Sequence, residues 1–167
     1  MEPMVDIAIK HAGAYAARYE LRLGERLGFG IHGSVHVVEH KIKGDKSAIK
    51  SHRATEFYVR ERAVYQRLSI AGISDILGFH VPQFIRADDD LEVIEMTIVT
   101  RPFVLDFAGA YVGAPPEFSE EIWAGWEAEK REQFGARWTA VCAVMNAFEE
   151  LGIFLVDVSP SNIAFLD

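Results

Sequence analysis

The sequence predicts an α+β fold, in which a five-stranded antiparallel sheet with one inserted helix is followed by a short helical region. Two observations carry this prediction. Apolar and polar residues alternate through residues 19–51 and again through 81–99, which is the period of strands buried on one face. Apolar residues recur every three or four positions in 55–68 and 138–148, which is the period of helices.

The first part of the chain predicts a helix, three strands and a second helix. Residues 1–18 carry alanine and isoleucine with few helix breakers, and an N-terminal helical extension is expected there. Residues 19–51 predict three successive antiparallel strands. Thr55 is a candidate N-cap, and a helix is expected over residues 54–70.

A hairpin completes the predicted sheet. Its strands are expected over residues 81–87 and 91–99, with the acidic turn Asp88–Asp90 between them. Arg101 and Pro102 then interrupt the strand pattern. The sheet-bearing part of the chain is therefore expected to occupy residues 19–99.

Residues 100–167 are expected to be mainly helical. Residues 114–116 read Ala-Pro-Pro and predict a linker, and Ser119 then predicts a capped helix start. Gly135 is expected to interrupt the helices, and Gly152 to end them. A buried helical stripe is predicted for Trp138, Val141, Cys142, Met145 and Phe148.

Composition excludes several classes of function. The chain has 17 basic and 25 acidic residues, a formal charge of −8, which argues against binding nucleic acid by counterion release. Its single cysteine excludes a disulfide framework and a multi-cysteine zinc site. No leader pattern or long apolar run is present, so a cytoplasmic protein with no membrane partner is expected. Most of the acidic excess lies after residue 90, which places any phosphate site in the first half.

The first candidate motif is the glycine-rich segment Gly28–Gly33, of the form G-x-G-x-x-G. A dinucleotide-binding fingerprint would need a helix directly after it, whereas Val35 and its neighbours alternate like a strand. A glycine loop between two strands suits a lid over phosphates, because glycine permits positive φ and leaves no side chain in the way. Taken alone, the segment is also compatible with a hairpin turn that binds nothing.

The second candidate is Lys50, in the sequence Ala48-Ile49-Lys50 at the end of the third predicted strand. An isolated lysine there would simply be exposed. Glu61 on the next helix is a candidate ion-pair partner that would position the ammonium toward phosphate oxygens, and Glu56 is the rival partner.

The third candidate is the loop Asp157–Asn162, which follows an apolar run. Its carboxylate can accept a proton from a substrate hydroxyl, and the amide of Asn162 can bind a metal ion on the phosphate side. Taken alone, this segment is also typical of a turn.

In this order and spacing, the three segments resemble the protein-kinase-like superfamily, over roughly residues 20–167. The resemblance implies a nucleotide-binding lobe over 19–99, a truncated helical lobe over 100–167, and the cofactors ATP and Mg²⁺. Asp157, Lys50 and Glu61 are then catalytic, Asn162 binds the metal, and Ile94 is the gatekeeper before an adenine-binding connection. The implied nucleotide-binding residues are Gly28, Gly30, Gly33, Val35, Ala48, Lys50, Ile94, Glu95 and Thr97.

The sequence also departs from the family pattern. Leu155 and Val156 replace the usual His and Arg, so regulation by a phosphorylated activation loop is not expected. Ser159 replaces a lysine, as in RIO-type and small-molecule kinases, which leaves the phosphoacceptor open between a protein and a small molecule. The Asp-Phe-Gly segment is missing after Asn162, and the terminal Asp167 is a weak substitute as a metal ligand.

Two alternatives to an active phosphotransferase therefore remain at this stage. One is a catalytically inactive, pseudokinase-like binding or scaffold module. The other is a chain whose helical lobe is completed by a second protomer or a partner chain. Both would explain why the metal has only one recognisable ligand after the catalytic aspartate.

The remaining signals favour ordinary structural roles. His32, His36 and His40 recur every four residues, but on a strand four residues span roughly 13 Å, so no shared zinc ion is predicted. Cys142 is expected to be a buried small residue. Trp123 and Trp126 are expected to pack in the core, with an exposed contact surface as the alternative.

Overall fold

The computed structural model describes residues 6–166, and the predictions made for residues 1–5 and for Asp167 lie outside this part. The main element is a five-stranded antiparallel sheet in the order β1-β2-β3-β7-β6. The predicted α+β class and the five antiparallel strands are therefore confirmed. The strands are β1 (Leu21–Phe29), β2 (Gly33–His40), β3 (Lys46–His52), β6 (Phe84–Asp88) and β7 (Val93–Met96).

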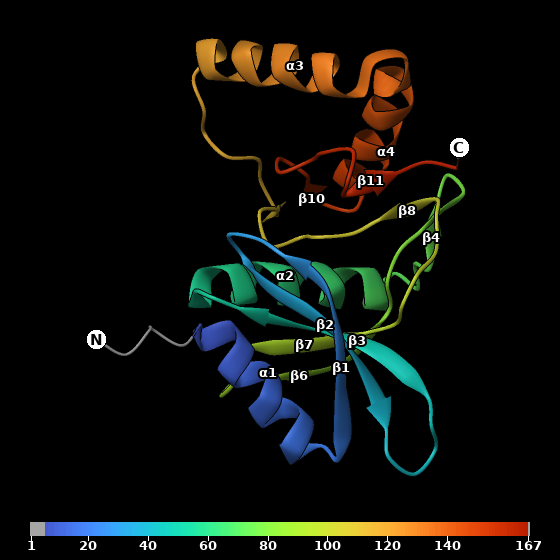
Figure 1. Ribbon diagram of the computed structural model, residues 1–167. Coiled ribbons are helices and arrows are strands. Elements are labelled where there is room, and N and C mark those ends of the chain that lie inside the picture. Colours follow the sequence, from blue (N-terminus) through green and yellow to red (C-terminus); the bar gives the residue numbers. More distant parts are fainter. Residues whose placement is uncertain (1–5, 167) are drawn as a thin grey trace.

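Two helices cover opposite faces of this sheet (Figure 1). Helix α1 (Ile7–Arg18) begins at Asp6, whose side chain accepts a hydrogen bond from the amide of Ala8 at 3.0 Å. It packs its small residues against one face of β3, where Ile49 is buried. Helix α2 (Thr55–Ile70) packs against the other face, where the alternate residue Ala48 is buried.

The predicted start of α2 needs one correction. Thr55 is the first helical residue, and Ala54 is the N-cap, with no side-chain cap hydrogen bond. The hydroxyl of Thr55 instead donates to the carboxylate of Glu92, in the turn before β7. A tertiary contact has therefore taken the place of the local cap.

Short strands join the sheet to the helical part. The sequence indicated one of them, in the apolar run that begins at Ile153, and not the others. Four of them form one sheet in the order β11-β8-β5-β4, and two form the pair β10-β9. With only two residues each, they are too short to show a period of alternation. They are β4 (Asp75–Ile76), β5 (Phe79–His80), β8 (Phe103–Val104), β9 (Tyr111–Val112), β10 (Ile153–Phe154) and β11 (Ile163–Ala164).

The pairings of these strands bring distant segments together. Strand β8 pairs with β11, with Val104 opposite Ile163, and β9 pairs with β10, with Val112 opposite Ile153. The segment between β8 and β9 therefore lies beside the segment between β10 and β11. These two segments contain Asp106 and Asp157, respectively.

The helices of the second part follow the prediction. Helix α3 (Glu120–Phe134) begins at Ser119, whose Oγ accepts from the amide of Ile122 at 3.2 Å. It ends at Gly135, where φ is +56°, and a short 3₁₀ turn leads into α4 (Trp138–Glu150). The buried stripe of α4 consists of Trp138, Val141, Val144, Met145 and Phe148. Cys142 is half-buried rather than fully buried, and burial raises the pKa of its thiol.

One hydrophobic core runs from α2 through the short strands to α4. The ring of Phe107 lies between those of Tyr65 and Phe148, with centroid distances of 5.5 and 5.7 Å. Trp123 and Trp126 are both half-buried, and the indole of Trp126 donates to the carbonyl of Val156 at 2.9 Å. The core therefore fixes both segments that carry the aspartates.

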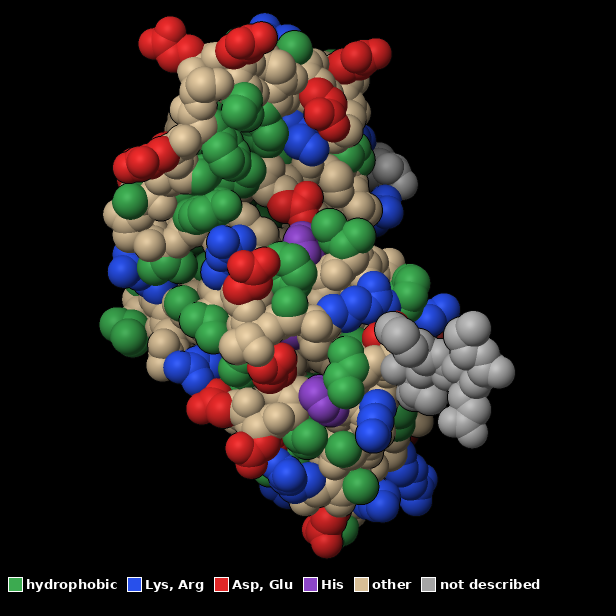
Figure 2. All heavy atoms as spheres, turned by 90° about the vertical axis from the view of Figure 1, so that its left-hand side faces the viewer, with side chains coloured by type: hydrophobic (Ala, Val, Ile, Leu, Met, Phe, Trp, Pro, Cys, Tyr) green, Lys and Arg blue, Asp and Glu red, His purple; other side chains and the backbone are tan. Residues whose placement is uncertain are grey.

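The surface is unevenly charged. Acidic side chains gather at the end of the molecule formed by α3, whereas most basic side chains in this view lie lower, over the sheet (Figure 2). No described helix is long and apolar enough to cross a membrane.

Candidate functional site

A cavity of about 760 Å³ lies between the glycine loop, the sheet and the segments that follow β8 and β10. It gathers residues from most of the motifs found in the sequence, although these motifs are far apart in the chain. The expected site residues that line it are Gly28, Gly30, Gly33, Val35, Ala48, Lys50, Glu61, Thr97, Asp157 and Asn162. This convergence identifies the cavity as the candidate functional site.

The glycine loop connects β1 to β2, as expected, but the reason for its glycines differs from the prediction. None of Gly28, Gly30 and Gly33 has a positive φ. A Cβ atom on Gly33 would lie 2.0 Å from the carbonyl oxygen of Ser51, so this glycine permits close approach of β2 to β3. A Cβ on Gly30 would meet nothing within 4 Å, and this part of the loop is open.

Lys50 and Glu61 form the expected ion pair inside the site. The Nζ atom of Lys50 lies 3.0 Å from Oε1 of Glu61, and both residues are almost completely buried. The rival partner Glu56 is exposed. The pair connects β3 to the middle of α2 and so fixes the ammonium at the cavity wall.

Glu61 makes two further contacts. Its carboxylate accepts hydrogen bonds from His52 Nε2 and from the amide of Phe107, both at 2.7 Å. Burial disfavours the charged carboxylate, but the Lys50 ammonium and the His52 hydrogen bond outweigh burial and lower the pKa of Glu61 to about 2. Burial likewise opposes the charge on Lys50, yet the carboxylates of Glu61 and Asp106 raise its pKa.

Asp106 is a site residue that the sequence reasoning missed. It follows β8 with a φ of +70°, and its Oδ1 lies 2.6 Å from Nζ of Lys50. The sequence motif that could have revealed it is Asp106-Phe107-Ala108-Gly109, which has the form Asp-Phe-x-Gly. The family pattern places such a motif after the residue that corresponds to Asn162, whereas Asp106 precedes the Asp157–Asn162 loop in this chain.

Gly109 explains how the two aspartate segments approach each other. A Cβ atom on Gly109 would lie 2.8 Å from Cβ of Asp157, closer than real Cβ atoms come. Only glycine at this position therefore leaves room for Asp157. The backbone amide of Leu105 also donates to the carbonyl of Asn162 at 2.9 Å, which ties the same two segments together.

The Asp157–Asn162 loop faces the cavity. The side chain of Asp157 is 45% exposed, which suits a group that must reach a ligand. The side-chain nitrogen of Asn162 donates a hydrogen bond to the backbone carbonyl of Asp157 at 3.1 Å, and this bond closes the loop. Asn162 is thereby oriented through its nitrogen, while its side-chain oxygen is the atom suited to a metal.

Two residues expected at the nucleotide, Ile94 and Glu95, do not line the cavity. Ile94 is completely buried in the core beside α2. Glu95 points to the opposite face, where its carboxylate accepts from Tyr15 at 2.7 Å and from Ser47 at 2.8 Å. Met96 lines the cavity instead, because β7 pairs with β3 so that Met96 lies opposite Ala48.

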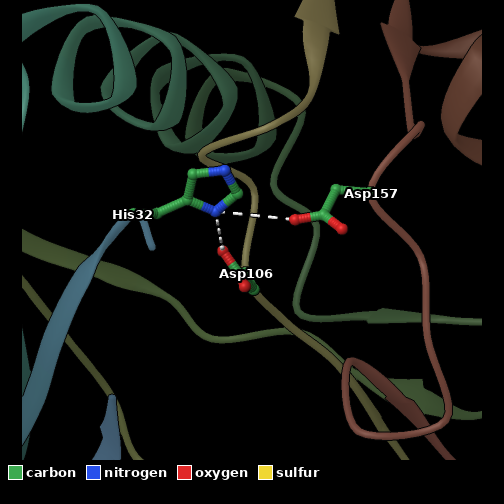
Figure 3. Close-up of side chains that lie close together, drawn as sticks. All are labelled: His32, Asp106 and Asp157. Carbon is green, nitrogen blue, oxygen red and sulfur yellow. Dashed lines mark ion pairs between the residues drawn. The ribbon is translucent and has the colours of Figure 1, made fainter. Parts of the chain in front are cut away.

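His32 is the second missed residue. Its Nδ1 lies 3.5 Å from Oδ2 of Asp157 and 3.9 Å from Oδ1 of Asp106 (Figure 3). His36, by contrast, is buried on β2 next to Ser34, so the histidine series does not converge on one point. Figure 3 shows one ring nitrogen of His32 facing both aspartates, which come from separate segments.

Comparison of the chain with protein-family models, with curated proteins and with solved structures finds no significant match.

Proposed function

We propose that this cavity binds ATP with Mg²⁺ and that the protein transfers the γ-phosphate to a hydroxyl group. The observation that carries the proposal is the convergence of Lys50, Glu61, Asp106 and Asp157 on one cavity covered by a glycine loop. Phosphoryl transfer requires positioning and charge stabilisation more than covalent chemistry, and these residue types supply both.

The nucleotide would lie between the sheet and the loop. The apolar side chains of Val35, Ala48 and Met96 would contact a base, and Thr97 begins the connecting segment directly after β7. The Gly28–Gly33 loop would cover the phosphates, and Lys50 would contact them from the cavity wall.

The charges at the site explain why a cation is needed. Three carboxylates line the cavity, those of Glu61, Asp106 and Asp157, together with the single ammonium of Lys50. Without a cation, the net negative charge of these groups would repel a triphosphate. Asp106 and Asn162 supply oxygen ligands of the kind that Mg²⁺ prefers. A bound Mg²⁺ would neutralise charge on the phosphates.

Asp106 also supports the kinase resemblance. In protein kinases the aspartate of Asp-Phe-Gly binds the metal and follows the catalytic loop. Here an Asp-Phe-x-Gly segment precedes that loop in the chain, but the β8–β11 and β9–β10 pairings place it beside Asp157. A second metal ligand is therefore available without any residues after Asn162.

In the transfer step, Asp157 would accept the proton from the acceptor hydroxyl. The hydroxyl oxygen then forms a bond to the γ-phosphorus, and the bond from the γ-phosphorus to the β–γ bridging oxygen breaks, so that ADP leaves with the electron pair. Asp157 suits this role because its carboxylate is half-exposed at the open side of the cavity. The acceptor is a protein or small-molecule hydroxyl.

A nucleotide-binding module without transfer activity is the second candidate function. It is favoured by Leu155 and Val156, which replace polar residues that kinases use, and by the contact between Asp157 and His32. In such a module ATP binding would hold the fold in a state recognised by a partner. An Asp157→Ala variant separates the two functions, because it abolishes transfer but leaves nucleotide binding intact.

The first test is calorimetric titration of Mg·ATP into the protein. We expect binding to be lost in Lys50→Ala and retained in Lys46→Ala, which removes an exposed lysine from the same strand. Equal affinity in wild type and Lys50→Ala, or no binding to wild type, would refute the proposed site. Circular dichroism of both variants checks that they fold.

A further inference from the structure

We propose that His32, Asp106 and Asp157 form a divalent transition-metal site that clamps the glycine loop onto the two aspartate segments. One ligand atom from each residue lies within 4.8 Å of the others, and no other such group of three occurs among the described residues. This site shares Asp106 with the proposed magnesium position, but it uses the imidazole of His32 and the carboxylate of Asp157 in place of Asn162, and it requires no nucleotide.

The distances suit a shared cation. Donor atoms about 2.1 Å from a tetrahedral ion are roughly 3.4 Å from one another. The Nδ1 atom of His32 lies 3.5 Å from a carboxylate oxygen of Asp157 and 3.9 Å from one of Asp106. The same nitrogen faces both carboxylates (Figure 3), so small side-chain movements would place all three donors around one ion.

Each ligand is positioned by a neighbour that is not itself a ligand. The ring of His32 meets the ring of Phe57 edge-on, with centroids 4.5 Å apart. Lys50 holds Asp106 at 2.6 Å, and Gly109 leaves the space that Asp157 occupies. Supporting contacts of this kind orient metal ligands before the ion binds.

The ligand set also indicates the class of ion. One imidazole with two carboxylates is suited to ions such as Mn²⁺ and Zn²⁺, which accept nitrogen as well as oxygen ligands, whereas Mg²⁺ prefers oxygen alone. The prediction that the strand histidines share no zinc is unaffected, because His32 finds its partners on other segments. A cation here would fix the lid in its closed position, since His32 lies within the Gly28–Gly33 loop.

The test uses Mn²⁺ alone, without nucleotide. Mn²⁺ is preferred to Zn²⁺ as a probe, because Zn²⁺ also binds free thiols and other histidines. Titration is followed by the electron paramagnetic resonance signal of free Mn²⁺ and by calorimetry. Wild type is expected to bind one Mn²⁺, and His32→Phe, which keeps a ring against Phe57, is expected to bind at least about tenfold more weakly.

Two controls make the result specific. His80→Ala removes an exposed imidazole elsewhere and should leave Mn²⁺ affinity unchanged. Mg²⁺ affinity should differ by less than about twofold between wild type and His32→Phe, because oxygen ligands dominate its binding. Hydrogen exchange of residues 28–33 should slow on Mn²⁺ addition in wild type only.

The proposal is overturned if wild type binds no Mn²⁺ at millimolar concentration, which would leave His32 as a simple ion-pair partner of the aspartates. It is equally overturned if wild type and His32→Phe bind Mn²⁺ alike. Neither result bears on nucleotide binding, which the Lys50→Ala titration tests separately.

Discussion

The Nζ atom of Lys50 lies 2.6 Å from Oδ1 of Asp106, and this contact joins the central strand of the sheet to the segment after β8. Lys50 is therefore shared between Glu61 on α2 and Asp106, with the three charged groups at one wall of the cavity. The arrangement places a lysine and the carboxylate proposed as a metal ligand next to each other. Through Lys50, Asp106 in the segment after β8 is connected to Glu61 on α2.

The proposed function assigns Asp106 to the cation of Mg·ATP. We expect Asp106→Asn to weaken Mg·ATP binding by at least about tenfold, because a carboxylate ligand is lost. The matched control is Asp75→Asn, which removes an exposed carboxylate from β4. Calorimetry with and without Mg²⁺ is the measurement, and an Asp106→Asn protein with wild-type affinity would show that Asp106 is not a ligand.

Removing Glu61 should destabilise the fold. Glu61→Ala leaves the buried ammonium of Lys50 with only one of its two carboxylate partners, and breaking a buried pair in this way costs about 3 to 5 kcal/mol. Glu56→Ala, at an exposed position on the same helix, should change the free energy of unfolding by less than about 0.5 kcal/mol. Urea denaturation followed by circular dichroism measures both, and equal midpoints would contradict the role given to Glu61.

The low pKa of Glu61 predicts a dependence of stability on pH. Its pKa is about 2 in the folded protein, below its value of 4.5 when unperturbed, so the unfolded chain takes up the proton first as the pH falls. Its contribution of about 3 kcal/mol is complete above pH 4.5 and is lost between about pH 4.5 and 2.

The pH prediction is checked by comparing wild type with Glu61→Gln in denaturant series at several pH values. The stability difference between them should be constant from pH 5 to 7 and should shrink as the pH falls below 4. A difference that stays constant down to pH 2 would mean that Glu61 does not titrate in this range.

The glycines of the loop should differ in their tolerance to alanine. Gly33→Ala places a Cβ against the Ser51 carbonyl and should cost about 1 to 3 kcal/mol through disruption of the β2–β3 pairing. Gly30→Ala meets no neighbour and should change stability by less than about 0.5 kcal/mol. Thermal unfolding of the two variants distinguishes them, and similar melting temperatures would argue against the close approach at Gly33.

Much of the fold could be predicted from local patterns. The alternation in residues 19–51 predicted three strands. Burial alternates along β2, whereas β1 is exposed over most of its length and β3 is buried over nearly all of its length. The caps and breakers at Ser119 and Gly135 predicted the limits of α3, because they act on the adjacent backbone. The Lys50–Glu61 pair was predicted because Lys50 lies at the end of the third strand and Glu61 lies on the helix that follows it.

The tertiary structure decided where the remaining site residues lie. The two-residue strands β8 to β11 have no period to detect, yet their pairings bring Asp106 next to Asp157. The register between β7 and β3 decided which residue of β7 lines the cavity. It places Met96 opposite Ala48, so Met96 lines the cavity and Ile94 does not. The sequence alone determined the long helices and strands and the residue types, because these follow from local periodicity. The short strands and the grouping of His32, Asp106 and Asp157 came from long-range pairing and packing.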